Sequence, residues 1–494
     1  MRSKPRSSSN SLGRRSRSER LRPKVRREAV GAATAEALPR RVAILGFARS
    51  GQALALALSK RGVALTVGDA KPRAAFEEAE VARLETSGVR FFFDGPPEDF
   101  LESAEWLAVS PGVPMRSPLV ERARERGLTV LSELEIAWRI AEAEAPGRHR
   151  WIAVTGTNGK STTTAWIAEI LRRAKRPVAL AGNIGVPLSA FLVERAPRDF
   201  VCEVSSFQLE AIDRFAPHVA VLTNITPDHL DRHDGFGDYV RAKQRVFENQ
   251  GPEDFAVLNQ DDAPSRRIVP PSRQVPFSRR ERAAGGAWTE KGSLVSEIGG
   301  PARPVVAEKD LALPGAHNVE NALAALAAAE CLETPAEAIA AGLTRFQGLP
   351  HRSELVLETG GVRWVDDSKG TNVDATKKSL EGYDTGRVLL ILGGRDKHGD
   401  FPALATGVAR AARVVLTIGE AAPVIEKALA GVVSLENAGT MDRAVERAAA
   451  LARPGDTVLL SPACASFDQY ANFEERGKHF ARLARQAASA VRET

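Results

Sequence analysis

Short apolar runs alternate with amphipathic helical patterns along the chain from about residue 40 onward. In the first part the apolar runs cover residues 42–46, 64–68 and 106–110. Strands that alternate with helices predict a parallel α/β sheet. Two stretches that contain proline and glycine, 145–150 and 347–350, interrupt the alternation and are typical of linkers. We therefore expect three α/β domains, over residues 39–146, 147–348 and 349–494.

The second and third parts of the chain continue this pattern. Residues 318–331 are rich in Ala and Leu and predict a buried helix, whereas residues 270–306, rich in Arg, Gly and Pro, predict a small peripheral sheet. In the third part, Gly360-Gly361 separates the runs 355–358 and 362–365, which predicts a hairpin. Further strand-like runs cover residues 178–181, 200–204, 219–223 and 255–258, and then 388–392, 414–418 and 458–460.

Composition is that of an ordinary globular protein. Of the 494 residues, 43% are hydrophobic and 26% are charged, which is usual for chains that fold around an apolar core in water. The apolar runs are short and end in glycine or charge, so we expect no membrane span. Three scattered cysteines argue against a disulfide framework or a zinc site, and they fit a reducing cytoplasm.

The positive charge belongs to one end of the chain. Residues 1–30 hold eleven Lys or Arg and two Glu, a net charge of +9, whereas the whole chain carries +6 and the remainder therefore −3. We expect residues 1–38 to form a disordered basic tail. A misassigned start codon, or binding to nucleic acid or anionic lipid, stays open for this segment. It lacks the apolar core of a secretory signal.

A glycine-containing loop between a strand and a helix carries the strongest chemical signal. The run Gly156-Thr157-Asn158-Gly159-Lys160-Ser161-Thr162 follows an apolar segment and opens an amphipathic helix. Glycines let backbone N–H groups approach nucleotide phosphates, Lys160 adds positive charge, and Ser161 can offer a hydroxyl to Mg²⁺. An ordinary Gly-rich turn is the alternative, but strand, loop, Lys-Ser pair and helix all coincide here.

A second glycine loop follows the first predicted strand. Gly46 and Gly51 flank Ala48, and Asp69 ends the next strand, at about the twenty-residue distance seen in dinucleotide sites. Ala48 stands where a glycine would let the backbone approach a dinucleotide pyrophosphate. We therefore expect either a nucleotide-sugar site or a purely structural turn at this loop.

Polar residues follow two later strands. Glu203 ends a strand beside the phosphate loop, a suitable place for a Mg²⁺ ligand, although a solvent-facing carboxylate at a strand end has the same pattern. Asp228, His229 and Asp231 form a compact cluster after the following strand, which favours contact with a hard cation or a substrate. Lys243 lies on a predicted helix, where a lone lysine is usually solvated.

The last part of the chain offers cations and hydroxyls at the ends of its predicted strands. Arg352, Lys397 and Ser466 are donors of the kind that an anionic amino acid needs. Ligands bind at the carboxyl ends of strands in open parallel sheets. Taken one at a time, these residues are equally compatible with loops that make local hydrogen bonds.

Together these motifs resemble those of the Mur ligases, over about residues 41–485. Gly-Thr-Asn-Gly-Lys-Ser-Thr at 156–162 is shared with the wider family, which includes folylpolyglutamate synthases. Ser-Ser-Phe-Gln-Leu-Glu at 205–210 and the segment 461–477 are similar to those of members that add D-glutamate. The chain departs from the family pattern at Ala48 and at Arg395-Asp396, ahead of Lys397.

The resemblance implies an α/β fold of three domains: a Rossmann-like N-terminal domain that binds a UDP-linked substrate, a central P-loop ATPase domain, and a Rossmann-like C-terminal domain. It implies an ATP-dependent amide ligase that adds D-glutamate to UDP-N-acetylmuramoyl-L-alanine, in cytoplasmic peptidoglycan precursor synthesis. The substrate carboxylate would attack the γ-phosphate of ATP, and the amine would then displace phosphate from the acyl phosphate. A monomer is expected, with no requirement for nucleic acid or a membrane span.

The same resemblance implies roles for individual residues. Two Mg²⁺ ions are expected, and a carbamate formed from CO₂ on Lys243 would give one of them an anionic oxygen ligand. Lys160, Glu203, His229 and Lys243 would be catalytic, and Ser161, Glu203, His229 and carbamylated Lys243 would hold metal. ATP would contact residues 156–162, Asn321, Arg352 and Asp367; the UDP-linked substrate Arg49, Ser50, Asp69, Ala70, Asn183 and Ser205; and D-glutamate Thr371, Lys397, Ser466 and Phe473.

Two kinds of alternative stay open. Another Mur-type ligase would add L-glutamate or extend folate, although folate enzymes typically begin directly with the ATPase domain. A non-catalytic ATP-dependent binding module belongs to a different class of protein. Against it, such a module would have little use for a complete acceptor pocket around Asp367, Lys397 and Ser466.

Overall fold

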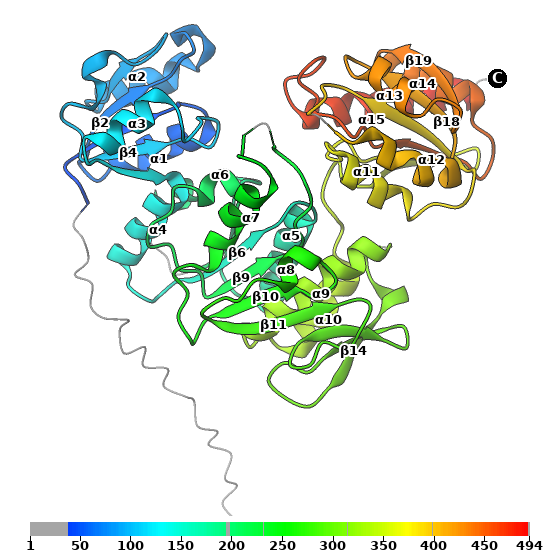
Figure 1. Cartoon of the computed structure of the whole chain (residues 1–494), viewed down its shortest axis with the longest axis horizontal. Coiled ribbons are helices and arrows are strands. Elements are labelled where there is room, and N and C mark those ends of the chain that lie inside the picture. Colours follow the sequence, from blue (N-terminus) through cyan, green and yellow to red (C-terminus); the bar gives the residue numbers. More distant parts are fainter. Residues whose placement is uncertain (1–37, 194–197, 231, 314, 398, 493–494) are drawn as a thin grey trace, which may run out of the picture. The chain divides into compact units, whose positions relative to one another are not determined.

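The computed structural model of the chain describes residues 38–193, 198–230, 232–313, 315–397 and 399–492. Its strands form three separate sheets of five, nine and six strands (Figure 1). The predicted basic tail, apart from Leu38, and Asp231 of the predicted polar cluster lie outside the described residues. Within the described ranges, no helix has both the length and the apolar character that a membrane span requires.

The first sheet has the strand order β3-β2-β1-β4-β5, and all its pairs are parallel, as predicted. The sequence pattern does not predict β3 and β5, because each of these strands contains only two apolar residues. The elements are β1 Arg41–Leu45, α1 Arg49–Ser59, β2 Ala64–Gly68, η1 Arg73–Ala75, α2 Glu78–Thr86, β3 Arg90–Phe92, η2 Glu98–Leu101, β4 Trp106–Val109, α3 Pro118–Glu125, β5 Thr129–Ser132 and α4 Glu133–Glu144.

The second sheet has the order β14-β13-β12-β11-β10-β9-β6-β8-β7. The segment 270–306, predicted as a small peripheral sheet, contributes strands at one edge of this larger sheet, because β11 pairs in parallel with β10. The elements are β6 Arg150–Thr155, α5 Lys160–Arg173, β7 Val178–Gly182, η3 Leu188–Val193, β8 Asp199–Glu203, α6 Ser206–Leu209, β9 Val219–Leu222, α7 Phe236–Gln244, η4 Arg245–Phe247, β10 Phe255–Asn259, α8 Ala263–Arg266, β11 Arg273–Ser278, β12 Ala287–Glu290, β13 Ser293–Ser296, β14 Arg303–Ala307, η5 Glu308–Asp310, α9 Ala316–Cys331 and α10 Ala336–Arg345.

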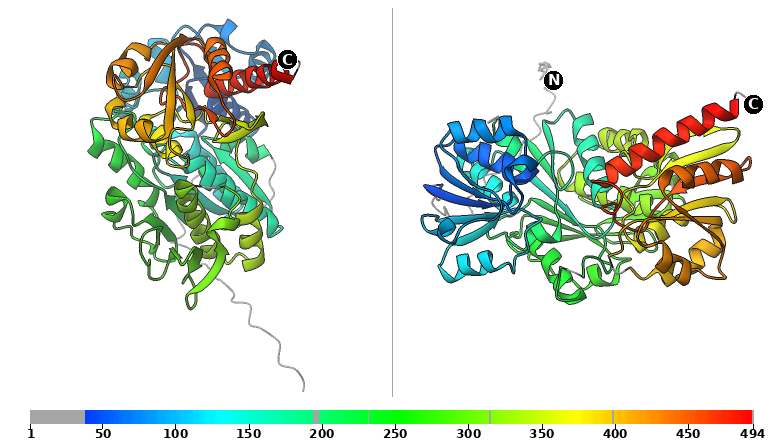
Figure 2. Two further views of the ribbon diagram at one scale, coloured as in Figure 1. Left: turned by 90° about the vertical axis from the view of Figure 1, so that its right-hand side faces the viewer. Right: turned by 90° about the horizontal axis from the view of Figure 1, so that it is seen from above.

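The third sheet has the order β15-β16-β20-β17-β18-β19. The predicted hairpin is confirmed as the antiparallel pair β15 and β16, and the remaining pairs are parallel. Helix α15, coloured red, runs along this sheet (Figure 2). The elements are β15 Glu354–Thr359, β16 Val362–Asp366, α11 Val373–Leu380, β17 Val388–Gly393, η6 Phe401–Leu404, α12 Ala405–Ala411, β18 Ala412–Ile418, α13 Ala422–Ala428, β19 Ser434–Gly439, α14 Met441–Leu451, β20 Thr457–Leu460 and α15 Phe473–Arg492.

The first and second sheets share an apolar core, whereas the third sheet has cores of its own. One core joins buried residues of the first sheet to those on one face of the second, for example Trp106 and Trp151. Helices α5, α9 and α10 cover the other face of the second sheet, and the predicted burial of α9 is confirmed. The third sheet has a core on each face, and the buried residues of both cores come from residues 362–484 alone.

Candidate active site

A cavity of about 830 Å³ lies at the carboxyl ends of strands from the second and third sheets. It brings together most of the residues that the sequence marks as functional, although they come from segments more than 300 residues apart. Those that line it are Thr157, Asn158, Gly159, Lys160, Thr162, Asn183, Glu203, Ser205, Asp228, His229, Lys243, Asn321, Arg352, Asp367, Thr371, Lys397, Ser466 and Phe473.

The phosphate loop has a backbone that only glycine fits at two positions. Gly156 and Gly159 have φ angles of +144° and +81°. A Cβ at Gly159 would lie 2.2 Å from Asn321 Oδ1, so the loop packs directly against the start of α9. The Lys160 ammonium folds back on this loop and donates to the carbonyl oxygens of Gly156 at 2.9 Å and Thr157 at 2.7 Å.

Glu203 is buried at the end of β8, beside the start of α5. One carboxylate oxygen accepts a hydrogen bond from Ser161, and the other accepts from Asn183 Nδ2 at 2.7 Å. Burial alone would raise the pKa of this carboxyl, but the positive charges of Lys160 and Arg352 outweigh burial and lower it. Glu203 is therefore an anion held in place by two hydrogen bonds.

Lys243 is almost completely enclosed, with 1% of its surface exposed. Its Nζ donates to the Gly156 carbonyl oxygen at 2.7 Å and lies 4.5 Å from the centre of the Tyr239 ring. Burial, together with the nearby charge of Lys160, lowers the pKa of Lys243 well below its ordinary value. A neutral amine at this position can act as a nucleophile, unlike an ordinary solvated lysine on a helix surface.

Asp228 and His229 follow β9 and face the third sheet. Asp228 accepts a hydrogen bond from Asn372 Nδ2 at 2.9 Å, and its other oxygen lies 3.4 Å from Lys397 Nζ. Burial lowers the pKa of His229 to about 4, so its imidazole is neutral at pH 7 and can coordinate a metal. The backbone of His229 has a φ of +54°, in the left-handed region.

Residues that flank the strands of the third sheet contact the region of the phosphate loop directly. Arg352 Nη2 donates to Ser161 Oγ at 2.6 Å. Asp374, on α11, accepts a hydrogen bond from Asn158 Nδ2 at 2.7 Å and from Thr226 Oγ1 at 3.2 Å. Burial raises the pKa of Asp367 to about 6.

The other end of the cavity carries the residues predicted to bind an amino acid. Lys369 Nζ lies 3.7 Å from the centre of the Phe473 ring, and burial lowers its pKa to about 8. Ser466 is buried. Together with Thr371 and Lys397, these groups form a wall of cations and hydroxyls suited to a dicarboxylate.

The predicted UDP-substrate residues divide into two groups. Asn183 and Ser205 line the cavity, whereas Arg49, Ser50, Asp69 and Ala70 lie in and near the glycine loop of the first sheet, outside it. Asp69 accepts a hydrogen bond from the backbone N–H of Phe47 at 2.6 Å, which fixes the loop. Arg49 donates to the Gly185 carbonyl oxygen, next to the loop of Asn183.

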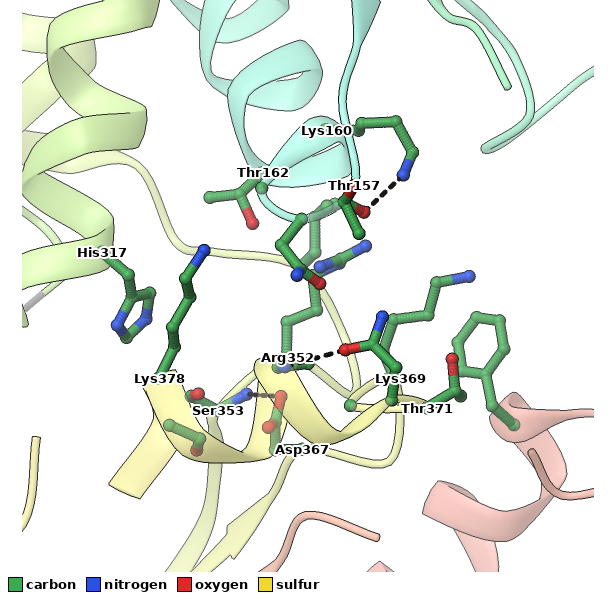
Figure 3. Close-up of a pocket in the computed structure, with 18 of the residues that line it drawn as sticks. Thr157, Lys160, Thr162, His317, Arg352, Ser353, Asp367, Lys369, Thr371 and Lys378 are labelled. Atoms are coloured by element: carbon green, nitrogen blue, oxygen red, sulfur yellow. Dashed lines mark hydrogen bonds between the residues drawn. The ribbon is translucent and has the colours of Figure 1, made fainter. Parts of the chain in front are cut away.

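Several residues of the cavity were missed by sequence reasoning. His317 and Lys378 lie beside each other at one end of it, and Lys369 lies nearer the amino-acid end (Figure 3). Asp374 and Lys378 form a pair at 3.2 Å with helical i, i+4 spacing. That spacing is visible in the sequence, but nothing in it shows that Asp374 faces the phosphate loop.

The donor atoms fit a divalent cation in one place. The Glu203 carboxylate beside the Ser161 hydroxyl provides the oxygen ligands that Mg²⁺ prefers. At the second predicted metal position, His229 offers a neutral nitrogen, but the unmodified Lys243 amine offers no oxygen. Two metal ions therefore fit these residues only if Lys243 is modified.

Three family matches cover most of the chain. Residues 40–132 match the Mur ligase MurD-like N-terminal domain, residues 154–329 the Mur ligase middle domain, and residues 351–464 the Mur ligase glutamate ligase domain. The UDP-N-acetylmuramoylalanine–D-glutamate ligase of Pelotomaculum thermopropionicum is 44% identical over 447 residues, which are 89% of this chain and 96% of the relative. The enzyme of the same name from Anaeromyxobacter dehalogenans is 42% identical over 468 residues, 91% of this chain and 98% of the relative.

Solved structures share the fold. A UDP-N-acetylmuramate–alanine ligase from Thermotoga maritima, 18% identical, superposes with a TM-score of 0.59 over 90% of this chain and 99% of its own. A MurF ligase from the same organism in complex with ADP, 16% identical, has a TM-score of 0.59 over 86% of this chain and 95% of its own. The predicted three-domain α/β fold is confirmed, and the chain belongs to the Mur ligase family.

Proposed function

We propose that this chain catalyses the ATP-dependent addition of D-glutamate to UDP-N-acetylmuramoyl-L-alanine. It is an ATP-dependent ligase of peptidoglycan precursor synthesis, as its family implies. The observation that carries the choice of substrates is the similarity to relatives named for this reaction, which reaches 44% identity over nearly the full length of the relative. The proposed domains span residues 39–146, 147–348 and 349–494, and their linkers separate the three sheets.

The charges of the cavity suit the first step of this reaction. A substrate carboxylate and the γ-phosphate of ATP are both anionic, so their approach requires positive charge. Lys160 and Arg352 lie where the phosphates would sit, at the phosphate loop and at Ser161. Asp367 lines the cavity and would help to position ATP, as would Asn321, which packs against the loop at Gly159.

The second step needs a bound amino acid whose amine reaches the acyl phosphate. Lys397 and Ser466 would bind the carboxylates of D-glutamate, with Thr371 and Phe473 completing the pocket.

Asn183 and Ser205 would contact the muramoyl substrate, and Arg49, Ser50, Asp69 and Ala70 its uridine end. Ser161 and Glu203 would hold one Mg²⁺, and His229 and carbamylated Lys243 a second; when bound, these ions neutralise phosphate charge.

The state of the Lys243 amine supports a carbamate at this position. Only the neutral amine attacks the carbon of CO₂, and burial lowers the pKa of Lys243 enough to make that form available. The N–C bond forms as one C=O bond of CO₂ opens onto its oxygen, and the nitrogen releases one proton to solvent. An anionic carbamate thus replaces the neutral amine.

A chemical rescue tests the carbamate. Lys243→Ala is expected to lose activity and to regain part of it with added acetate or another short carboxylate. Lys160→Ala is the matched control, because it removes a positive charge that a carboxylate cannot replace. Full activity of Lys243→Ala without any addition would rule the carbamate out.

Phosphate release tests the whole reaction. The assay contains ATP, Mg²⁺ and UDP-N-acetylmuramoyl-L-alanine, with D-glutamate, L-glutamate or no amino acid. Release only with D-glutamate is the expected result. Release with L-glutamate would keep the ligase chemistry and overturn the acceptor, whereas ATP binding without release in any mixture would favour a binding module.

A further inference from the structure

A histidine and two carboxylates converge on one point outside the cavity. His233 precedes α7, Asp238 lies in the first turn of α7, and Glu210 directly follows α6. The potential ligand atoms of these three residues lie within 4.8 Å of one another. None of the three lines the active-site cavity, and the reaction proposed above uses none of them.

The Nδ1 atom of His233 has no hydrogen-bond partner among the described residues. The His233 side chain is fully enclosed, with 0% of its surface exposed, and its Nδ1 atom is a buried polar atom without a partner among the described residues. It lies 3.5 Å from Glu210 Oε1 and 3.5 Å from Asp238 Oδ2. Good N–H···O bonds are shorter, at about 2.7–3.2 Å.

Ser206 and Phe207 hold the other nitrogen, Nε2, and the imidazole ring of His233 in place. Nε2 lies 3.0 Å from Ser206 Oγ, and the Phe207 ring is stacked on the imidazole with its centre 5.6 Å away. A metal-bound histidine generally donates its other N–H to such an oxygen. If Nε2 donates to Ser206, the lone pair of Nδ1 points between two carboxylates, which is favourable only with a cation between them.

We propose that His233 Nδ1, Glu210 and Asp238 bind a divalent cation of the zinc type. Around a tetrahedral Zn²⁺ with bonds of about 2.1 Å, neighbouring ligand atoms are about 3.4 Å apart, close to the two 3.5 Å separations measured here. One imidazole and two carboxylates suit Zn²⁺ better than Mg²⁺, which prefers oxygen alone. The two carboxylate side chains are 24% and 25% exposed, so a water ligand and an entry path are available.

The surrounding charges leave the proposed ligand oxygens available. Arg241 binds the opposite oxygen of Asp238, at 3.2 Å, and Arg116 pairs with Asp234 rather than with the cluster. The proposed ligand oxygen Oδ2 accepts one hydrogen bond, from the Asp234 N–H at 3.3 Å, and a carboxylate oxygen has a second lone pair for a cation. Two carboxylates and a neutral imidazole then match the charge of a divalent ion. The competing arrangement has no ion and shares one Nδ1 proton between the two carboxylates.

The position of the ion indicates its role. Helix α6 begins at Ser206, shortly after Glu203 ends β8, and α7 carries Tyr239 and Lys243. An ion bound to Glu210, His233 and Asp238 would tie these two helices together. It would therefore hold Lys243 in position without taking part in the reaction.

Calorimetric titration of Zn²⁺ into the zinc-free full-length chain tests the site, and saturating Mg²⁺ in the buffer occupies the nucleotide site. Wild type is expected to bind one equivalent, and Zn²⁺ should raise its melting temperature. Glu210→Gln and Asp238→Asn should weaken binding at least about tenfold and remove the thermal shift. Asp234→Asn is the matched control, because it changes a neighbouring carboxylate that pairs with Arg116.

X-ray absorption of the zinc-loaded wild type provides a second readout that needs no variant. Nitrogen and oxygen ligands without sulfur are expected. Absence of a bound equivalent in wild type, or sulfur ligands, would overturn the proposal. If Glu210→Gln and Asp238→Asn bind Zn²⁺ as tightly as wild type, the ion lies elsewhere and the proposal is overturned. The same follows if Glu203→Gln abolishes Zn²⁺ binding and these two variants do not.

Discussion

The second sheet meets the first and the third sheets through two different kinds of contact. Towards the first sheet, apolar side chains of both form one continuous core, and buried carboxylates of α4 accept hydrogen bonds from main-chain N–H groups. Towards the third sheet, the buried apolar residues of each core stay on their own side. The hydrogen bonds there join side chains of the candidate active site.

Glu135 illustrates the first kind of contact and Asp374 the second. Glu135 has 0% of its surface exposed and accepts hydrogen bonds from the N–H groups of Asp213 at 3.0 Å and Phe215 at 2.9 Å. Asp374 binds Asn158, a residue that ATP itself would contact. The first contact is thus independent of substrate, whereas the second involves groups that substrates also need, so ligand binding and the third-sheet contact must be coupled.

Among the variants, Glu135→Ala is expected to have the largest effect, a loss of stability against unfolding. The change leaves main-chain N–H groups and the Arg139 guanidinium without their buried acceptor, so it should lower the free energy of unfolding by about 3–5 kcal/mol. Urea unfolding followed by tryptophan fluorescence measures this. Glu125→Ala, an exposed carboxylate on α3, is the control and should change nothing. A loss below about 1 kcal/mol for Glu135→Ala would show that the carboxylate does not anchor the first sheet.

The KM for ATP should depend on pH because of Asp367, which lies where the second and third sheets meet. Burial raises its pKa to about 6, so the carboxyl gains a proton as the pH falls through 6 and loses its strength as an acceptor. The KM for ATP should therefore rise by up to about tenfold for each pH unit below 6 and stay level above it. In Asp367→Asn the KM should be high throughout, and the inflection near pH 6 should vanish. An inflection that survives this substitution would assign the titration to another group.

A smaller effect is expected from Asp374→Ala. Loss of the hydrogen bonds to Asn158 and Thr226 should lower kcat/KM about fivefold, since one such bond contributes about 1 kcal/mol. The unfolding midpoint should hardly move, in contrast to Glu135→Ala. Lys377→Ala, an exposed neighbour on α11, is the control for the assay. Unfolding at a much lower urea concentration would mean that this contact supports the fold.

The smallest effect is expected from Lys378→Ala. Its ammonium lies at the His317 end of the cavity and pairs with Asp374 at 3.2 Å, while a quarter of the side chain is exposed. Water screens such a pair, so the KM for ATP should rise only about twofold to threefold. The same steady-state assay measures this. A tenfold or larger rise would mean that Lys378 contacts the nucleotide directly.

The sequence predicts the fold well where a strand is a continuous apolar run. Strand β2 begins and ends as predicted, and the hairpin at Gly360-Gly361 is present. The short strands β3 and β5 escape prediction, because their apolar residues are too few to form a pattern. The prediction of a small peripheral sheet over residues 270–306 misses that its strands extend the central sheet. Strand pairing is a long-range property, and the pairing of β11 with β10 leaves no mark in the local sequence.

The residues of the candidate site likewise divide into those with a local sequence pattern and those without one. The loop at 156–162 has its own glycine pattern, and the resemblance to a family brings in Lys243 and Phe473, which no local pattern distinguishes. Asp374 and Lys378 were missed, because their importance arises only when α11 faces the phosphate loop. The roles assigned to all of these site residues stay predictions, and Arg49, Ser50, Asp69 and Ala70 lie outside the cavity.

Hydrogen–deuterium exchange with and without ATP, Mg²⁺ and UDP-N-acetylmuramoyl-L-alanine tests the difference between the two contacts most directly. Ligands are expected to slow exchange in residues 156–162 and 369–380, which carry the contacts between the second and third sheets. Exchange in residues 132–137 and 211–215, which carry the contacts between the first and second sheets, should not change. Equal slowing in both regions, or slowing in the second pair alone, would contradict the account.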